Sequence, residues 1–156
     1  MVGIVLRVCA VAAALALPVE AHAIMRGASP LSANDPVLQE LAAMKQRIEA
    51  GHAAETLPRL EALVREQADA ADVWNIYGFA LRHAGRLPES RRAYERALAI
   101  EPDHLGAHEY MGELFLAEGN LAGAERLLER LVVLCPGDCE ERGDLARAIA
   151  AYRASR

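Results

Sequence analysis

The sequence is in register with itself at a fixed offset of 34 residues. Glycine, leucine and proline recur at this offset in the pairs Gly78 and Gly112, Gly85 and Gly119, Leu87 and Leu121, and Pro102 and Pro136. A repeat of this length is one amphipathic helical hairpin, which cannot bury its apolar face alone and must stack against neighbouring copies. The period therefore predicts an all-α fold in which helical hairpins stack into a solenoid.

The residues that recur resemble those of the tetratricopeptide repeat family. In the unit 71–104 they are Trp74, Tyr77, Gly78, Leu81, Tyr94, Ala97 and Pro102, and in the unit 105–138 they are Met111, Gly112, Phe115, Ala124, Leu128 and Pro136. Ser90 and His108 replace the alanine and the tryptophan that the family usually has. The upstream unit 37–70 keeps the pattern only in part and has Ala68 where the terminating proline is expected.

This resemblance implies three tetratricopeptide-like repeats over 37–138, the first degenerate, followed by a capping helix over 139–156. A stripe of apolar residues supports the capping helix and consists of Leu145, Ile149 and Tyr152. Gly78 and Gly112 are expected to let the two helices of each hairpin approach closely, and Gly85 and Gly119 are expected to mark the turn between them. Pro58 lies where the second helix of the first unit is expected, so that helix is predicted to start late or to bend there.

The first 23 residues are typical of a secretory signal peptide. An apolar run from Val8 to Leu17 follows Arg7, and small residues precede a predicted cleavage point after Ala23. The mature chain would then be periplasmic or secreted and would begin with a flexible tail over 24–35. The alternative is that the segment is retained as a membrane anchor.

Composition and charge narrow the classes of partner. The chain has 156 residues, 53% hydrophobic and 25% charged, with a formal net charge of −5. These values fit one compact domain and give no overall attraction to nucleic acid. The arginines between 82 and 96 alternate with Glu89 and Glu95, which predicts a salt-paired outer face. We therefore expect a protein partner and no nucleic acid.

The resemblance implies a concave groove lined by the first helix of each hairpin. Carried onto this chain, the groove residues are Lys45, Asp72, Asn75, Phe79, Arg82, Glu109, Glu113 and Leu116. The family's known carboxylate clamp would have only Lys45, Asn75 and Arg82 as candidates, with acidic neighbours that repel a carboxylate. We expect instead a partner segment with an apolar group near Phe79 and positive charge toward Glu113. The alternative is that these are ordinary solvated helix positions.

Cys135 and Cys139 flank a predicted bend between the last repeat and the capping helix. In an exported protein such a pair is expected to form a disulfide. The alternatives are free thiols, a redox-active dithiol, and a copper(I) site completed by His104 or His108. His108 occupies a position that normally holds a buried aromatic residue, which favours a packed, hydrogen-bonded core histidine.

The sequence contains no phosphate-cradling glycine loop, no nucleophile elbow and no His-Glu-x-x-His helix. We therefore expect a protein without enzymatic activity or cofactor that acts as an adaptor or scaffold. The alternative function is an exported accessory protein that handles thiols or copper through Cys135 and Cys139. A third interpretation is self-association through the edge at Leu38 and Leu41, since a homo-oligomer would cover it.

Overall fold

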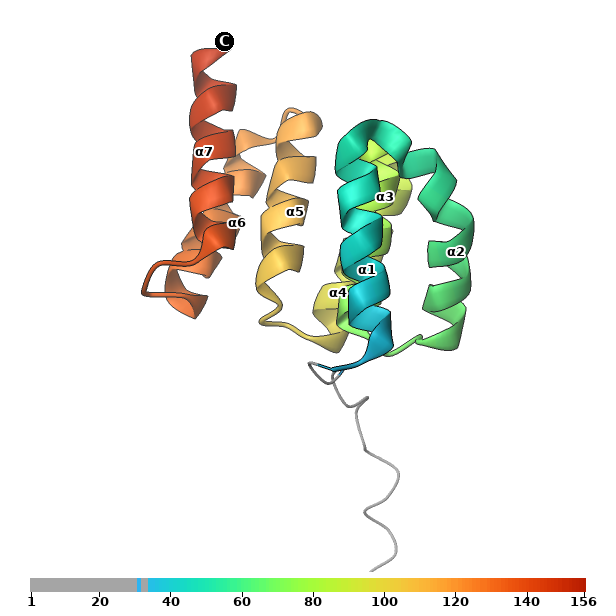
Figure 1. Ribbon diagram of the computed structural model, residues 1–156. Helices are drawn as coiled ribbons and strands as arrows, with labels where there is room; N and C mark the ends of the chain where they lie inside the picture. The colour runs from blue at the N-terminus through green and yellow to red at the C-terminus, as the bar shows by residue number, and fades with distance from the viewer. Residues whose placement is uncertain (1–30, 32–33) are drawn as a thin grey trace, which may run out of the picture.

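The computed structural model describes residue 31 and residues 34–156. The predicted signal peptide and most of the predicted tail lie outside the described residues. The described helices, labelled in Figure 1, are α1 (Pro36–Arg47), η1 (Ile48–His52), α2 (Ala53–Glu66), α3 (Ala71–His83), α4 (Leu87–Ile100), α5 (Leu105–Ala117), α6 (Leu121–Leu134) and α7 (Glu140–Ala154). None of them is both long and apolar enough to cross a membrane.

The all-α fold class predicted from the repeat is confirmed. Helices pair into hairpins α3 with α4 and α5 with α6, and each hairpin packs on the next through α4 and α5 and through α6 and α7. Helices α1, α3, α5 and α7 also contact one another in that order, so they form one side of the stack. Figure 1 shows the helices standing side by side, with α2 at one end and α7 at the other.

Turns and helix starts follow from local chemistry. Gly85 and Gly119 close the two hairpins with φ of 76° and 78°, a conformation that favours glycine. The Asp35 carboxylate accepts a hydrogen bond from the Val37 amide at 2.9 Å and so caps α1, whose first residue is proline. The predicted hairpin turns are therefore at the positions that the repeat requires.

The degenerate first unit has a different connection. The wide turn η1 joins α1 to α2, and Gly51 within it has φ of 91°. Helix α2 begins at Ala53 and continues through Pro58, so it does not start late. Pro58 lies on the exposed side of α2.

Two glycines allow close packing, but not against the same kind of neighbour. A Cβ on Gly78 would lie 2.6 Å from the Tyr94 ring on α4, so this glycine brings together the two helices of one hairpin as predicted. A Cβ on Gly112 would lie 2.6 Å from Leu145 on α7. The prediction for Gly112 was therefore wrong, because the close neighbour is the capping helix and not the second helix of its own hairpin.

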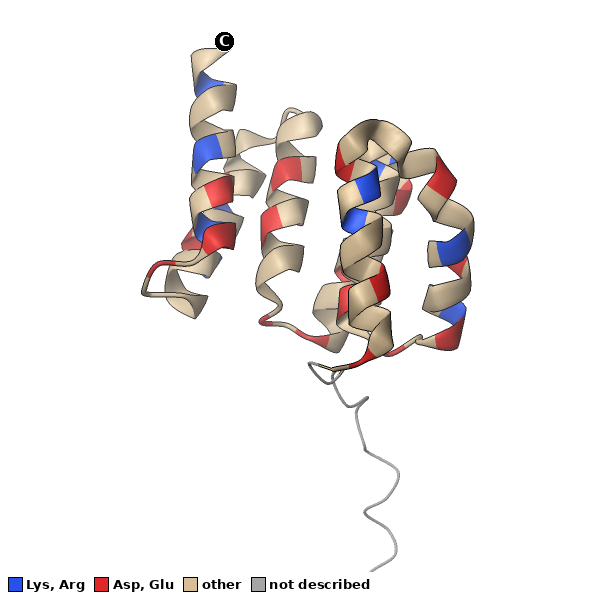
Figure 2. Cartoon of the chain, in the orientation of Figure 1, with Lys and Arg blue, Asp and Glu red and all other residues tan. Residues whose placement is uncertain are grey.

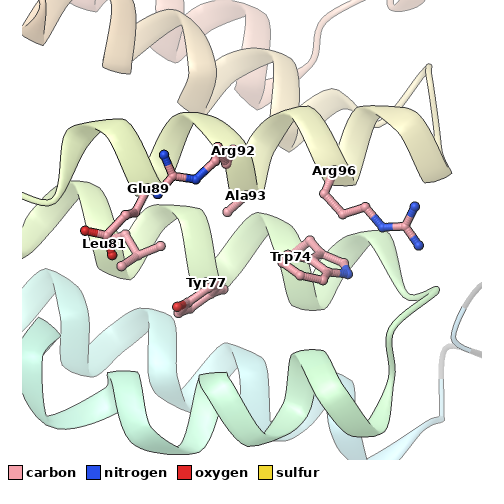
Figure 3. Close-up of a pocket in the computed structure, with 7 residues that line it drawn as sticks. All are labelled: Trp74, Tyr77, Leu81, Glu89, Arg92, Ala93 and Arg96. Atoms are coloured by element: carbon pink, nitrogen blue, oxygen red, sulfur yellow. The ribbon is translucent and has the colours of Figure 1, made fainter.

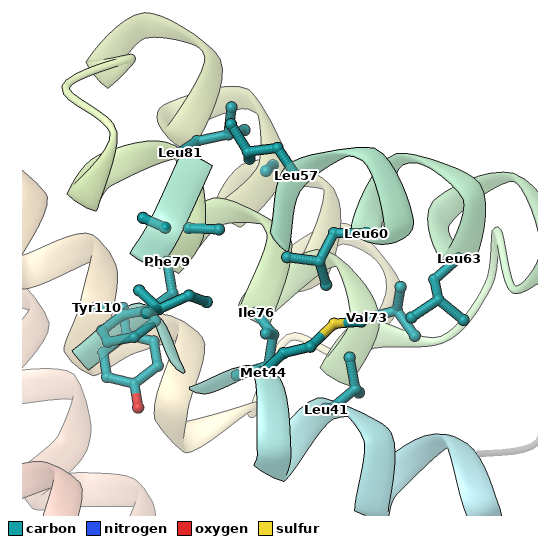
Figure 4. Packing of buried hydrophobic residues seen from close by; sticks show 14 of the residues in the cluster. Leu41, Met44, Leu57, Leu60, Leu63, Val73, Ile76, Phe79, Leu81 and Tyr110 are labelled. Carbon is teal, nitrogen blue, oxygen red and sulfur yellow. The ribbon is translucent and has the colours of Figure 1, made fainter. Parts of the chain in front are cut away.

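The interior consists of two apolar clusters that meet at α5. The first, shown in Figure 4, joins α1 to α4 and includes Tyr110 and Leu114 from α5. The second joins α5 to α7 and contains Leu116, Ala124, Leu131, Leu145 and Ile149, with Tyr152 packed against it. The predicted apolar stripe of the capping helix is thus confirmed, and α5 links the two halves of the stack.

Candidate functional site

The side formed by α1, α3, α5 and α7 carries adjoining hollows, which we call the concave face. A central hollow of about 190 Å³ is lined by Lys45, Asn75, His104, Gly106, Glu109, Tyr110, Glu140, Glu141 and Asp144. It shares Lys45, Glu109, Tyr110 and Asp144 with a hollow of about 340 Å³ beside Arg82. It shares His104, Gly106 and Glu141 with a third, of about 300 Å³, beside Asp72.

The concave face gathers residues that are far apart in the sequence. Of the predicted groove residues, those that line these hollows are Lys45, Asp72, Asn75, Phe79, Arg82, Glu109 and Glu113. Leu116 does not join them, because its side chain lies in the second apolar cluster and is only 8% exposed. The repeat geometry places the others together because they recur on the same side of successive first helices.

The sequence analysis missed the contribution of α7. Glu140, Glu141 and Asp144 lie in its first turns and line the concave face. The signal was present: Glu141 lies one helical turn before Leu145, and a helix whose apolar stripe packs on α5 brings its first turn to the same side of the stack. Tyr110, Gly106 and His104 were also missed, because their roles depend on contacts between repeats.

The concave face is acidic, and its cations are already paired. The Lys45 amino group lies 3.8 Å from the Glu49 carboxylate, and the Arg82 guanidinium lies 2.5 Å from the Glu113 carboxylate. Figure 2 shows acidic positions along α5 and at the start of α7. A carboxylate clamp from Lys45, Asn75 and Arg82 is therefore not supported by this arrangement.

Glu109 has the most unusual environment on this face. Its side chain is buried, and within residues 34–156 it forms no ion pair or hydrogen bond. Burial, together with the carboxylates of Glu113, Glu141 and Glu140, raises the pKa of Glu109 to about 8, against the opposing effect of Lys45. At neutral pH the group is therefore mainly protonated, which avoids the cost of burying an unpaired charge.

Phe79 differs from the expectation drawn from the sequence. Its side chain is 4% exposed, and its ring packs 4.7 Å from the Tyr110 ring and 4.4 Å from the His83 ring between centroids. It lines the Arg82 hollow, but it presents little apolar surface to the apolar group of a partner segment that we expected near it. The concave face is thus mainly polar.

Cys135 and Cys139 form a disulfide between the end of α6 and the start of α7, with their Cα atoms 6.4 Å apart. The two histidines considered as copper ligands are engaged elsewhere. His108 is buried and its Nε2 shares a hydrogen bond with the Pro102 carbonyl at 2.9 Å, which confirms a packed core residue. His104 Nδ1 accepts from the Ala107 amide at 3.1 Å, and its Nε2 faces Asp72.

Another hollow lies away from the concave face, on α3 and α4. Figure 3 shows its lining, in which Trp74, Tyr77 and Leu81 come from α3, and Glu89, Arg92, Ala93 and Arg96 come from α4. The indole N–H of Trp74 donates to the Ala68 carbonyl at 2.9 Å. This hollow is more apolar than the concave face and contains none of the predicted groove residues.

The fold and the concave face define a helical-repeat protein of the kind that binds other proteins. A family model described as tetratricopeptide repeat matches residues 43–104 and 84–138. The chain therefore belongs to the tetratricopeptide repeat family, as the sequence resemblance indicated.

Known proteins that are similar to this chain include a solved complex and a curated enzyme. A solved structure of PcrH in complex with the chaperone binding region of PopD has a TM-score of 0.61 and 20% identity, and the match covers 84% of this chain and 96% of that one. The imidazolonepropionase of Sphingopyxis alaskensis is 30% identical over 129 residues, which cover 76% of this chain. This chain spans about a third of the length of that curated relative, since the match covers 32% of it.

Proposed function

We propose that this protein is a non-catalytic adaptor that holds a segment of a partner protein against the concave face. The observation that carries the proposal is the convergence of Lys45, Asn75 and Glu109, which come from three different helices, on one hollow. A concave surface built from successive repeats is the usual binding surface of such solenoids. The size of the hollows suits side chains of an extended or helical segment.

The similar structure supports this assignment. PcrH was solved with a region of another protein, PopD, bound to it, and its fold covers most of this chain. The activity named for the imidazolonepropionase is not proposed here, because the alignment leaves most of that protein without a counterpart.

We also propose that the protein acts outside the cytoplasm, in the periplasm or after secretion, once the segment before Ile24 has been removed. The disulfide between Cys135 and Cys139 supports this location, because such bonds persist mainly in oxidising compartments. The intact mass of the protein from its native cells, measured with and without reduction and thiol alkylation, tests both points. A mass that includes residues 1–23, or free thiols before reduction, would contradict the proposal.

The adaptor role is tested by photo-crosslinking in the native cells. A photoreactive amino acid replaces either Glu49 or Asp144, which line the Arg82 hollow. We expect one discrete crosslinked protein from both positions, because a bound segment would pass over both residues. The matched control places the same amino acid at Glu129, an exposed position on α6 that lines none of the hollows of the concave face.

The pattern of crosslinks distinguishes a partner on the concave face from other kinds of contact. An adduct from the two concave positions and none from Glu129 supports the adaptor. Equal adducts from all three positions would show only random encounters, and adducts from Glu129 alone would place the partner on the outer surface.

A further inference from the structure

A small residue, Ala93, leaves open the hollow that α3 and α4 form away from the concave face. The hollow has a volume of about 400 Å³ and is lined by Trp74, Tyr77 and Leu81 from α3 and by Ala93 and charged residues from α4 (Figure 3). At the offset of 34 residues, the position of Ala93 is occupied by Leu127, which packs against the second apolar cluster. The next repeat thus has a large side chain at the position where this repeat leaves space.

The apolar wall of this hollow is held in place and remains accessible. The indole N–H of Trp74 donates to the Ala68 carbonyl at 2.9 Å, and the Trp74 and Tyr77 rings meet edge to face with their centroids 6.3 Å apart. Both side chains are partly exposed, whereas Leu81 and Ala93 are buried. A large apolar group placed against this wall would remove apolar surface from water, and the wall is already ordered before the group arrives.

The edge of the hollow carries positive charge. Arg92 is exposed and forms no ion pair in the described part of the chain. Glu89, the acidic residue of the lining, is already paired with Arg86. Arg96 lies 3.1 Å from the carboxylate of Asp69, but both side chains are exposed, so this pair is weak. Figure 3 shows the guanidinium groups of both lining arginines extending away from the two rings, so the hollow combines an open apolar wall with an available cation.

We propose that this hollow is a second docking site, for a partner segment in which a large apolar side chain is followed by an acidic one. The apolar side chain would lie against Trp74 and Tyr77, and the carboxylate would accept hydrogen bonds from the Arg92 guanidinium. Guanidinium groups match carboxylates in both charge and geometry, whereas a basic segment would be repelled at the same edge. Because this hollow lies away from the concave face, one molecule would hold two segments at the same time.

The test uses the fluorescence of Trp74, which is the single tryptophan of the chain and therefore reports on the hollow itself. The probe is the peptide acetyl-Gly-Phe-Asp-Gly-amide, titrated into the protein with excitation selective for tryptophan. Control peptides replace its aspartate with asparagine or lysine, or its phenylalanine with alanine. We expect a saturable change with the Phe-Asp peptide, about tenfold weaker binding of the asparagine and alanine peptides, and none of the lysine peptide.

Variants then locate the binding. Arg92→Gln should weaken binding of the Phe-Asp peptide about tenfold and leave the affinity for the asparagine peptide unchanged, because only the carboxylate uses this arginine. Arg126→Gln is the matched control, since Arg126 stands 34 residues further on, is exposed on α6 and does not line this hollow. Ala93→Leu fills the hollow with the residue of the next repeat and should weaken binding of every peptide. Circular dichroism of each variant verifies the fold.

Three results would overturn this docking site. The first is equal affinity for the Phe-Asp and asparagine peptides, and the second is unchanged affinity for the Phe-Asp peptide in Arg92→Gln. The third is tighter binding of acetyl-Gly-Phe with a free carboxylate, which would assign the hollow to the end of a chain. The crosslinks from Glu49 and Asp144 test the concave face separately, so failure of either site leaves the other proposal in place.

Discussion

At the scale of single residues, Gly78 sets the distance between α3 and α4. Its missing side chain makes room for the Tyr94 ring, which is completely buried. Its carbonyl oxygen accepts a hydrogen bond from the Ser90 hydroxyl at 2.7 Å, which ties the same two helices together. Serine in place of the family's usual alanine thus adds a buried, satisfied polar contact at the closest approach of the hairpin.

Gly78→Ala should lower the free energy of unfolding by about 1–3 kcal/mol, the usual cost of forcing an extra carbon into a packed core. The added Cβ would lie 2.6 Å from the fully buried ring of Tyr94. Urea unfolding monitored by circular dichroism measures the change. Gly137→Ala is the matched control, because a Cβ there meets nothing within 4 Å, and its effect should stay within about 0.5 kcal/mol. Equal effects would contradict this account of Gly78.

Glu109 is a second residue whose environment affects the stability of the protein, in this case its dependence on pH. Its pKa rises from an ordinary value of 4.5 to about 8 in the folded protein, so between these pH values the folded state holds a proton that the unfolded state does not. The free energy of unfolding therefore falls as pH rises through this window, by at most about 1.4 kcal/mol per pH unit from this group. Burial is the main cause of the raised pKa; Glu113 on α5 and Glu140 and Glu141 on α7 raise it further, and Lys45 on α1 lowers it.

Glu109→Gln should remove this contribution and make the stability less dependent on pH between about 5 and 8. The variant should gain stability relative to the parent protein as pH increases, since it has no proton to lose. Urea unfolding at several pH values measures both proteins. For Glu129→Gln, at an exposed position, the free energy of unfolding should depend on pH as it does in the parent protein. The same pH dependence in Glu109→Gln would show that Glu109 is not the titrating group.

At the scale of helices, the junction between α6 and α7 is held by chemistry that the earlier junctions lack. Hairpins α3 with α4 and α5 with α6 turn on a glycine with positive φ, whereas α6 and α7 are joined through the disulfide between Cys135 and Cys139. The Arg142 guanidinium of α7 also donates to the Cys135 carbonyl at 3.1 Å. The capping helix is therefore fastened covalently to the last repeat.

The double variant Cys135→Ser/Cys139→Ser should keep the fold. Its free energy of unfolding should be lower by about 2 kcal/mol, because the disulfide no longer reduces the conformational entropy of the unfolded chain. Reduction of the parent protein should have the same effect and should leave the variant unchanged. Urea unfolding curves of both proteins, with and without reductant, measure these changes in the free energy of unfolding. Loss of partner crosslinking in a variant that remains folded would instead favour the thiol-handling alternative from the sequence analysis.

At the scale of the whole molecule, stability depends on neighbouring contacts along the stack. The first apolar cluster joins α1 to α5 and the second joins α5 to α7, so only α5 belongs to both. In such a stack each unit is stabilised mainly by its neighbours, and the ends can open without the middle. The capping helix, packed on one side only, is the end expected to open most easily.

Leu145→Ala should confine its effect to this end. Leu145 is fully buried against Gly112, and leucine-to-alanine changes in a core cost about 2–5 kcal/mol. Native-state hydrogen exchange should therefore show lost protection in α6 and α7 and retained protection in α3. A uniform loss across all helices would show instead that the stack unfolds as one cooperative unit.

The sequence by itself determined the repeat, the helical hairpins and most of the concave lining, because these follow from a period of 34 and from which residues recur on one side of a helix. It also determined that Gly85 and Gly119 form turns, since the need for positive φ is local. Tertiary structure alone decided that Leu116 and Phe79 are buried, that Gly112 meets Leu145, and that the acids of α7 complete the central hollow. The physical reason is that a period fixes how each repeat contacts the next, whereas α7 stands outside the period, and its docking on α5 depends on packing between residues distant in sequence.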